Sequence, residues 1–268
     1  MKTAALILSL AAAAPALAMT QEDLLQASLL PGWRMESGHH MAGLSLELAP
    51  GWKTYWRRPG EAGIPPVFDW SGSENVAAVK VHWPSPVMFH TNGMQTVGYK
   101  GGVVLPLEVV PKVAGQPVHL KARVDMGICN DICMPAEVTV SADLDPAGGG
   151  QDGIRAALKA RPASGGQGGG QGGVGRVSCR VEPIPDGLRL TATVEIGAQG
   201  PDEAVVIEPA DPAIWVSDGV YSRAGGMLTA VSELVAPGGV PFALDRSALR
   251  LTVLGGARAV EIDGCPAP

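Results

Sequence analysis

Aromatic residues and long apolar runs are both scarce in this sequence. It has three Phe and three Tyr among 268 residues, and after the N-terminus no segment free of charge and proline approaches the length of a membrane span. Blocks of like charge are also missing, because the net charge of −6 is spread along the chain, which argues against a nucleic-acid partner. Gly-x-Ser-x-Gly, paired-carboxylate and thioredoxin-type Cys-x-x-Cys motifs are absent too, and the glycine-rich runs lack the setting of a phosphate loop.

Glycine and proline are abundant, with 36 and 23 residues, and between them apolar side chains alternate with polar ones. The period of two is clear at 44–48, 79–81, 118–124, 188–196, 249–253 and 260–262, with further strands expected at 103–110, 136–144, 203–208, 213–216 and 227–235. Short strands between turns, without helices between them, are typical of antiparallel sandwiches. We expect an all-β protein of two immunoglobulin-like antiparallel β-sandwich domains joined by a Gly-rich linker.

Changes in composition along the chain divide it into four parts. Residues 1–18 have the charged start, apolar run and small-residue end of a secretory signal peptide. Residues 19–147 form the expected first domain, in which 20–30 fit a short helix. Residues 148–175 contain a short helix at 152–161 and a flexible Gly/Gln linker at 164–175. The expected second sandwich occupies 176–268, and the exported protein is placed in a compartment where disulfides persist.

Two of the four cysteines, Cys129 and Cys133, lie four positions apart. A bridge between them closes so small a loop that it stabilises the fold by only about 2 kcal/mol. The pair fits disulfide geometry only if the segment bends, and Asn130 and Asp131 favour a bend between two strands. We therefore interpret the pair as redox-active. A small structural bridge, two reduced thiols and half of a metal site stay open as alternatives.

Cys179 and Cys265 are far apart in the sequence. A bridge between them encloses roughly 87 residues and is worth about 4.6 kcal/mol in the same loop-entropy estimate, so this pair is interpreted as a structural disulfide. A second redox pair and unpaired thiols remain alternatives. The nearest charges to the first pair, Asp125 and Asp131, disfavour a thiolate, so we expect a thiol that reacts mainly when a partner docks.

A cluster of soft ligands at 88–94 includes Met88, His90 and Met94. Thioether and imidazole groups suit copper, so a copper-binding or copper-delivery protein is the alternative function. The simpler interpretation is a loop whose Met and Phe side chains cover an apolar surface. A non-redox binding module with two permanent bridges is the second alternative.

Several blocks together resemble the N-terminal periplasmic domain of the DsbD family of thiol-disulfide reductases, in its ScsB-like branch. They are Gly51-Trp52-Lys53-Thr54-Tyr55-Trp56-Arg57-Arg58-Pro59-Gly60, Gly63-Ile64-Pro65-Pro66, Asp69-Trp70-Ser71, Trp83-Pro84, Gly98-Tyr99-Lys100, Leu105-Pro106-Leu107 and the Cys129/Cys133 segment with Pro135. Their order and approximate separation agree with the family over roughly residues 30–145. The Cys-x-x-x-Cys spacing is tighter than in the better-known members.

The resemblance implies an immunoglobulin-like domain that accepts electrons from a membrane-embedded thiol reductase. It passes them to thioredoxin-like periplasmic proteins by thiol-disulfide exchange, without a cofactor. Independently of the resemblance, we expect a monomer that binds no nucleic acid and does not insert stably into a membrane. Cys133 maps onto the cysteine that forms the mixed disulfide, and Cys129 onto the resolving one. The family's cap loop maps onto 88–98, where Phe89 or Met94 is the lid side chain and His90 lies between them. Cytochrome c maturation or copper tolerance is the implied setting.

Overall fold

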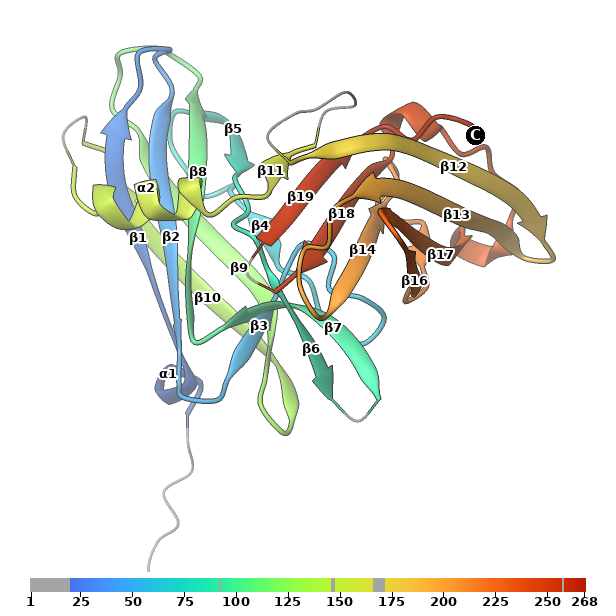
Figure 1. Ribbon diagram of the computed structural model, residues 1–268. Coiled ribbons are helices and arrows are strands. Elements are labelled where there is room, and N and C mark those ends of the chain that lie inside the picture. Colours follow the sequence, from blue (N-terminus) through green and yellow to red (C-terminus); the bar gives the residue numbers. More distant parts are fainter. Residues whose placement is uncertain (1–19, 92, 146–147, 166–171, 257) are drawn as a thin grey trace, which may run out of the picture.

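The computed structural model describes residues 20–268, apart from 92, 146–147, 166–171 and 257. Within these residues the chain forms four β-sheets, packed as two sandwiches side by side (Figure 1). The expected all-β, immunoglobulin-like architecture is confirmed, and all strand pairs are antiparallel except one short parallel pair. None of the described helices is long and apolar enough to cross a bilayer. The predicted signal peptide lies outside the described residues.

The first sandwich packs a four-stranded sheet against a six-stranded one. The smaller sheet has the order β1 (Leu25–Arg34), β2 (His40–Leu48), β8 (Gly102–Pro111), β5 (Val76–Val81). The larger has the order β10 (Cys133–Asp143), β9 (His119–Cys129), β3 (Lys53–Tyr55), β7 (Met94–Lys100), β6 (Val87–Thr91), with β4 (Val67–Asp69) also paired to β9.

The second sandwich is built in the same way from later strands. One sheet has the order β11 (Ala163–Ser164), β19 (Arg258–Asp263), β18 (Arg250–Gly255), β14 (Glu203–Glu208). The other has the order β12 (Val174–Ile184), β13 (Gly187–Ile196), β17 (Met227–Val235), β15 (Trp215–Val216), with β16 (Val220–Ala224) also on β17. Two 3-10 turns, η1 (Pro237–Gly239) and η2 (Arg246–Ala248), precede β18.

The alternating residues of the sequence form the two cores, as the period-two pattern predicts. Leu44, Leu120 and Val124 are fully buried in the first core, and Leu190 and Leu251 in the second. Because each strand turns one face inward, burying these side chains also fixes the register of the strands. This register determines which residues lie beside the cysteines.

The helix expected at 20–30 is wrong in its extent. Helix α1 covers only Gln21–Leu24, where the Thr20 N–H donates to the Asp23 carboxylate (2.8 Å). From Leu25 the chain continues as β1 and pairs with β2, with Leu25 opposite Leu48. Leu24 and Leu25 are both buried in the first core, so tertiary packing overrides the local preference for helix.

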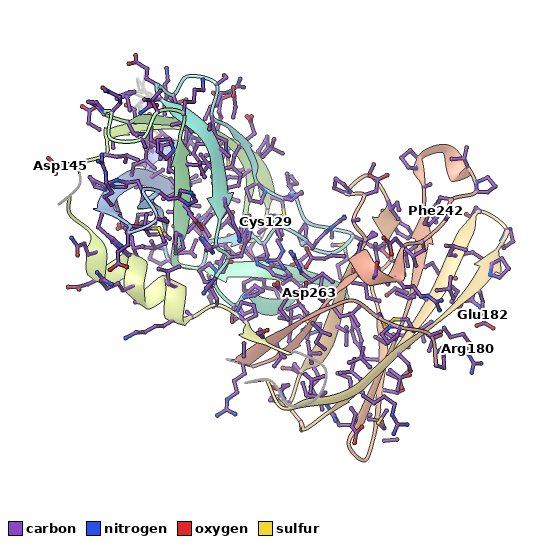
Figure 2. All side chains as sticks on the ribbon, turned by 90° about the horizontal axis from the view of Figure 1, so that it is seen from above. Cys129, Asp145, Arg180, Glu182, Phe242 and Asp263 are labelled. Atoms are coloured by element: carbon purple, nitrogen blue, oxygen red, sulfur yellow. A yellow bond between two sulfur atoms is a disulfide. The ribbon has the colours of Figure 1, made fainter. Side chains whose placement is uncertain are left out.

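Helix α2 (Gln151–Lys159) lies against β8 and β1 and leads from the first sandwich to the second. The described ends of the expected linker are extended: β11 pairs with β19, and β12 starts at Val174. Seen from above, Asp263 lies on the side of the second sandwich nearest the first, with Phe242 and Glu182 farther away (Figure 2).

Candidate functional site

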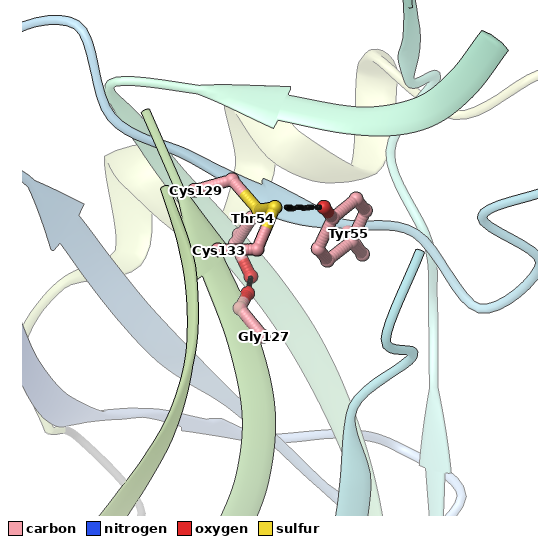
Figure 3. Close-up of a disulfide and its surroundings, with 5 residues drawn as sticks. All are labelled: Thr54, Tyr55, Gly127, Cys129 and Cys133. Atoms are coloured by element: carbon pink, nitrogen blue, oxygen red, sulfur yellow. Dashed lines mark hydrogen bonds between the residues drawn. A yellow bond between two sulfur atoms is a disulfide. The ribbon is translucent and has the colours of Figure 1, made fainter. Parts of the chain in front are cut away.

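The first cysteine pair closes the hairpin between β9 and β10. Cys129 ends β9, Cys133 begins β10, and the two are directly opposite in the strand register. In the short loop between them, the Asn130 N–H donates to the Ile132 carbonyl (3.2 Å). The sulfurs are bonded and the two Cα atoms are 4.1 Å apart (Figure 3). The predicted bend between two strands is confirmed.

The two cysteines differ sharply in exposure. Cys129 is fully buried, whereas Cys133 is exposed, and the neighbouring Ile132 side chain is 76% exposed. An attacking thiolate needs access to the sulfur that it attacks. Cys133 is therefore the more accessible cysteine of the pair, and Cys129 is the shielded one.

Tyr55 contacts both sulfurs from the middle of the sheet. Its hydroxyl lies 2.7 Å from Cys129 Sγ and 3.3 Å from Cys133 Sγ (Figure 3). The residue is 2% exposed, and burial raises the pKa of its phenol above the ordinary value of 10.0. Because the phenol stays protonated at neutral pH, it can donate a hydrogen bond to a sulfur that becomes a thiolate.

Strand β3 supplies two more neighbours. Thr54 donates to the Gly127 carbonyl (2.9 Å), which ties β3 to the strand that carries Cys129. Lys53 is directly opposite Cys129 in the register, so the two side chains lie on one face of the sheet. Lys53 is 9% exposed, and burial lowers the pKa of its ammonium group. The sequence shows two acids near the cysteines, Asp125 and Asp131. The fold adds a cation, Lys53, in the position opposite Cys129.

The expected cap loop is a hairpin formed by β6 and β7. The register runs from Tyr55 to Gly98 and on to Val87, so Phe89, two residues farther along β6, lies on the same sheet face as the cysteines. Its half-buried ring is 4.9 Å from Lys53 Nζ, measured to the ring centroid. Met94 lies on this face too and is 49% exposed, which leaves both proposed lid side chains on the cysteine side.

The proposed copper ligands do not converge. Met88 and His90 alternate with Phe89 along β6 and so lie on the opposite face of the hairpin from Met94. The described residues contain no group of three His, Cys, Asp or Glu side chains placed to hold a metal ion.

Three other histidines have carboxylate partners. His39 and His82 bind the two oxygens of Glu108, at 2.7 and 2.9 Å, and His119 binds Asp143 at 2.7 Å. The Glu108 contacts lie on other strands than the cysteine hairpin, and the His119–Asp143 contact lies at the end of β9 and β10 that is farthest from the cysteines.

Cys179 and Cys265 are bonded to each other in the second core, with their Cα atoms 5.5 Å apart. Cys179 lies in β12 and Cys265 follows β19, so the bridge joins the first and last strands of the second sandwich after the linker. Both residues are at most 1% exposed. A partner protein has no access to this bond.

Sequence reasoning missed Tyr55 and Lys53 as site residues. Both belong to a block of aromatic and basic residues far from the cysteines in the sequence, and Tyr55 precedes Cys129 by 74 positions. Their role depends on β3 lying next to β9, which no local pattern reveals.

Comparisons with known proteins agree with the geometry. Residues 22–145 match the family described as thiol:disulfide interchange protein DsbD, N-terminal. The crystal structure of the N-terminal periplasmic domain of ScsB from Proteus mirabilis is similar in fold, with a TM-score of 0.67 and 22% sequence identity. The match covers 94% of this chain and 96% of that one, so it includes both sandwiches. No curated protein sequence matches significantly. The predicted resemblance to the DsbD N-terminal domain is thus confirmed over residues 22–145.

Proposed function

We propose that the first domain is a periplasmic thiol-disulfide exchange module in which Cys133 reacts with other proteins and Cys129 resolves. The observation that carries this proposal is the unequal exposure of two bonded cysteines at the tip of a hairpin. A bridge meant only for stability gains little from so short a loop and has no need of an exposed sulfur.

Reduction of the pair takes two exchange steps. A partner thiolate attacks Cys133 Sγ, which forms a mixed disulfide, breaks the Cys129–Cys133 bond and releases Cys129 as a thiolate. The Tyr55 hydroxyl, 2.7 Å from that sulfur, stabilises the leaving thiolate by donating a hydrogen bond. The partner's second thiolate then attacks the partner sulfur of the mixed disulfide. This forms the partner's own disulfide and releases Cys133 as a thiolate. Two electrons enter the pair, and two protons follow from solvent.

Delivery to a substrate reverses these steps. The Cys133 thiolate attacks the substrate disulfide and forms a mixed disulfide, and one substrate sulfur leaves as a thiolate. The Cys129 thiolate then attacks Cys133 Sγ, which restores the Cys129–Cys133 bond and releases the second substrate thiolate. The sulfurs carry both electrons, so the cycle requires no cofactor.

The partners we propose are a membrane-embedded thiol reductase as electron donor and thioredoxin-like proteins as acceptors. The matched family and the periplasmic location named for the ScsB domain support this assignment. Phe89 and Met94 are proposed as the lid over the pair, which limits reaction with small thiols until a partner displaces it.

Trapping with single-cysteine variants tests the roles of the two sulfurs. We expect Cys129→Ala to form a stable mixed disulfide with an oxidised thioredoxin-like protein, because Cys133 stays exposed and the resolving thiol is missing. Cys133→Ala leaves only the buried sulfur and is expected to trap at least about tenfold less. Non-reducing electrophoresis and mass spectrometry identify the adduct.

The double variant Cys179→Ala/Cys265→Ala serves as the control, since loss of the buried bridge leaves the exposed pair intact. Its first pair is expected to exchange at the wild-type rate. If neither Cys129→Ala nor Cys133→Ala holds any partner, or if the buried cysteine is the one that traps, the proposed roles are wrong.

A further inference from the structure

The strand that carries Cys133 is open along one side. Among the described residues, β10 is the terminal strand of its sheet, with β9 as its one neighbour in the ladder. In an antiparallel ladder the N–H and C=O of a residue point toward the same side, and this side alternates from one residue to the next. The outer edge of β10 is therefore formed by every second residue.

Glu137 identifies which residues these are. Its N–H donates to Gln21 Oε1 (3.3 Å), and its C=O accepts from Gln21 Nε2 (2.8 Å), so both groups point away from β9. Pro135 and Cys133 lie two and four positions before Glu137 and share its orientation. Pro135 fits this place because a proline at a strand edge omits no ladder hydrogen bond.

Gln21 already demonstrates what the edge can bind. A carboxamide has the same donor and acceptor as a peptide group, and Gln21 meets Glu137 in the way that a residue of an added strand does. Gln21 also ends the open part of the edge. What remains is the N–H and C=O of Cys133 and the C=O of Pro135, which is enough for a short extended segment.

The spacing of an added strand agrees with that of a disulfide. Directly opposite residues in a hydrogen-bonded antiparallel pair have Cα atoms about 5.5 Å apart. Cα atoms across a disulfide are usually about 4.4–6.8 Å apart, with a maximum near 5.5–6 Å. A cysteine opposite Cys133 on an added strand thus lies at bonding distance. The exposed Ile132 next to Cys133 offers this segment an apolar contact.

We infer that the partner thiol protein docks by strand addition: the extended segment with its reacting cysteine pairs with the outer edge of β10 at Cys133, and Gln21 marks the end of the docking edge. The inference rests on the proposed exchange function. It identifies the partner by a short extended backbone around its cysteine, so backbone pairing and not a particular side chain aligns the two sulfurs.

Hydrogen exchange of the Cys133 amide tests this geometry directly. The full chain with Cys129→Ala is converted to two mixed disulfides at Cys133, one with a five-residue Ala/Gly peptide with a central Cys and one with cysteamine, which has no peptide backbone. The disulfide tether raises the effective concentration of the peptide at the edge. We expect the Cys133 amide to exchange at least about tenfold more slowly in the peptide adduct. The Met134 amide, which points toward β9, is expected to exchange equally in both adducts.

A second variant extends the edge. Gln21→Ala frees the Glu137 backbone, so a peptide with a central Cys and four residues on each side of it is long enough to reach Glu137, four positions after Cys133. This peptide is expected to slow exchange of the Glu137 amide in Gln21→Ala, whereas Gln26→Ala on β1 leaves that exchange as in the parent protein. Equal exchange of the Cys133 amide in the peptide and cysteamine adducts overturns strand addition while leaving the exchange function intact. Failure of Cys133 to form either adduct overturns the exchange function, and strand addition with it.

Discussion

At the scale of single residues, the Tyr55 hydroxyl is the group best placed to control the reactivity of Cys129. It is buried, it lies 2.7 Å from the sulfur, and burial keeps its phenol in the protonated, donating form. A hydrogen bond to a charged acceptor is worth about 1.5–3 kcal/mol, which corresponds to about one to two pKa units for a thiol. In the proposed exchange reaction, we therefore expect Tyr55 to make the buried cysteine a better leaving group.

Replacing Tyr55 by Phe removes the hydroxyl and keeps the ring. In a Cys133→Ala background, where Cys129 is a free thiol, we expect Tyr55→Phe to raise the Cys129 pKa by about one unit or more. Titration of thiolate absorbance, or of the alkylation rate against pH, measures the shift. Tyr99→Phe is the control, because the Tyr99 hydroxyl donates to the Pro84 carbonyl (2.9 Å) instead of a sulfur. An unchanged Cys129 pKa in Tyr55→Phe contradicts the assignment.

His82 adds a pH dependence to the first sandwich. Burial is the largest cause of its lowered pKa, and the Glu108 carboxylate opposes the shift only in part. A base with a pKa lowered below 6.5 contributes stability that is complete above that pH and is lost as the pH falls through the lowered value. We expect the free energy of unfolding to decrease between pH 7 and about pH 5, and to decrease less in His82→Gln. Urea unfolding at several pH values measures this, with His119→Gln as the exposed control; parallel curves for wild type and His82→Gln contradict it.

These residues also show what a sequence can reveal at this scale. Cys129 and Cys133 were recognisable because their spacing is local and disulfide geometry then dictates a bend. Tyr55 and Lys53 were not, because their proximity to Cys129 comes from the pairing of β3 with β9, about 75 positions apart in the chain. The unequal exposure of the two cysteines depends on the same long-range pairing.

At the scale of elements, the β6–β7 hairpin places Phe89 on the same sheet face as the cysteines. The Phe89 ring contacts Lys53, the residue opposite Cys129, and the proposed lid predicts that this ring restricts the approach of small thiols from that side. We expect Phe89→Ala to speed reduction of the Cys129–Cys133 bond by dithiothreitol about tenfold or less, the effect of losing a contact of about 1 kcal/mol. Stopped-flow alkylation or mass spectrometry gives the rate.

Met88→Ala is the matched control for this hairpin. Met88 is adjacent to Phe89 but lies on the opposite face, so its truncation alters packing without uncovering the sulfurs. Equal acceleration by Phe89→Ala and Met88→Ala assigns the effect to loosening of the hairpin and contradicts a lid. A lid also predicts that reaction with a docked protein partner changes less than reaction with dithiothreitol.

The elements themselves were predicted unevenly, for physical reasons. Strands with a strict period of two, such as those around Leu44 and Leu120, were found because one sheet face is buried. Residues 25–30 were predicted as helix because Thr20 and Asp23 fit a helix start and Pro31 a helix end, yet they form β1, since pairing with β2 decides. A proline in a strand favours an edge or a bulge, yet Pro106 lies in β8, between β2 and β5. The proline is tolerated there because the pairing of β8 with β5 ends at Leu107, one residue after Pro106.

At the scale of the whole molecule, the second sandwich is attached close to the cysteine site. The Asp218 N–H of the second sandwich donates to Glu61 (2.8 Å), in the loop after β3, and Ile64 of the same loop accepts from the Gly127 N–H (3.4 Å). One loop thus contacts the other domain on one side and the strand of Cys129 on the other. Composition and linker pattern indicated two domains, but contacts between surfaces have no periodicity, so this arrangement was not predictable.

The strongest contact between the domains is an ion pair at Arg57. Its guanidinium binds both oxygens of Glu208, at 2.9 and 2.8 Å, and also Glu261, and it stacks on Trp56 at 4.0 Å from the ring centroid. The side chains of Arg57 and Glu208 are only 16% and 10% exposed. Removing one partner of such a pair leaves an incompletely compensated charge away from water.

Glu208→Ala is therefore expected to destabilise the protein strongly. Loss of one partner of a buried pair costs about 3–5 kcal/mol, and we expect the lower end here, because Glu261 still binds Arg57. The control is Glu233→Ala, which breaks the exposed Arg189–Glu233 pair and is expected to cost less than about 1 kcal/mol. Urea unfolding, followed through Trp fluorescence, gives both values. If the two variants lose equal stability, the Arg57 ion pair does not stabilise the contact between the domains. The loop after β3, which contacts Asp218 and Gly127, is then held by its own contacts.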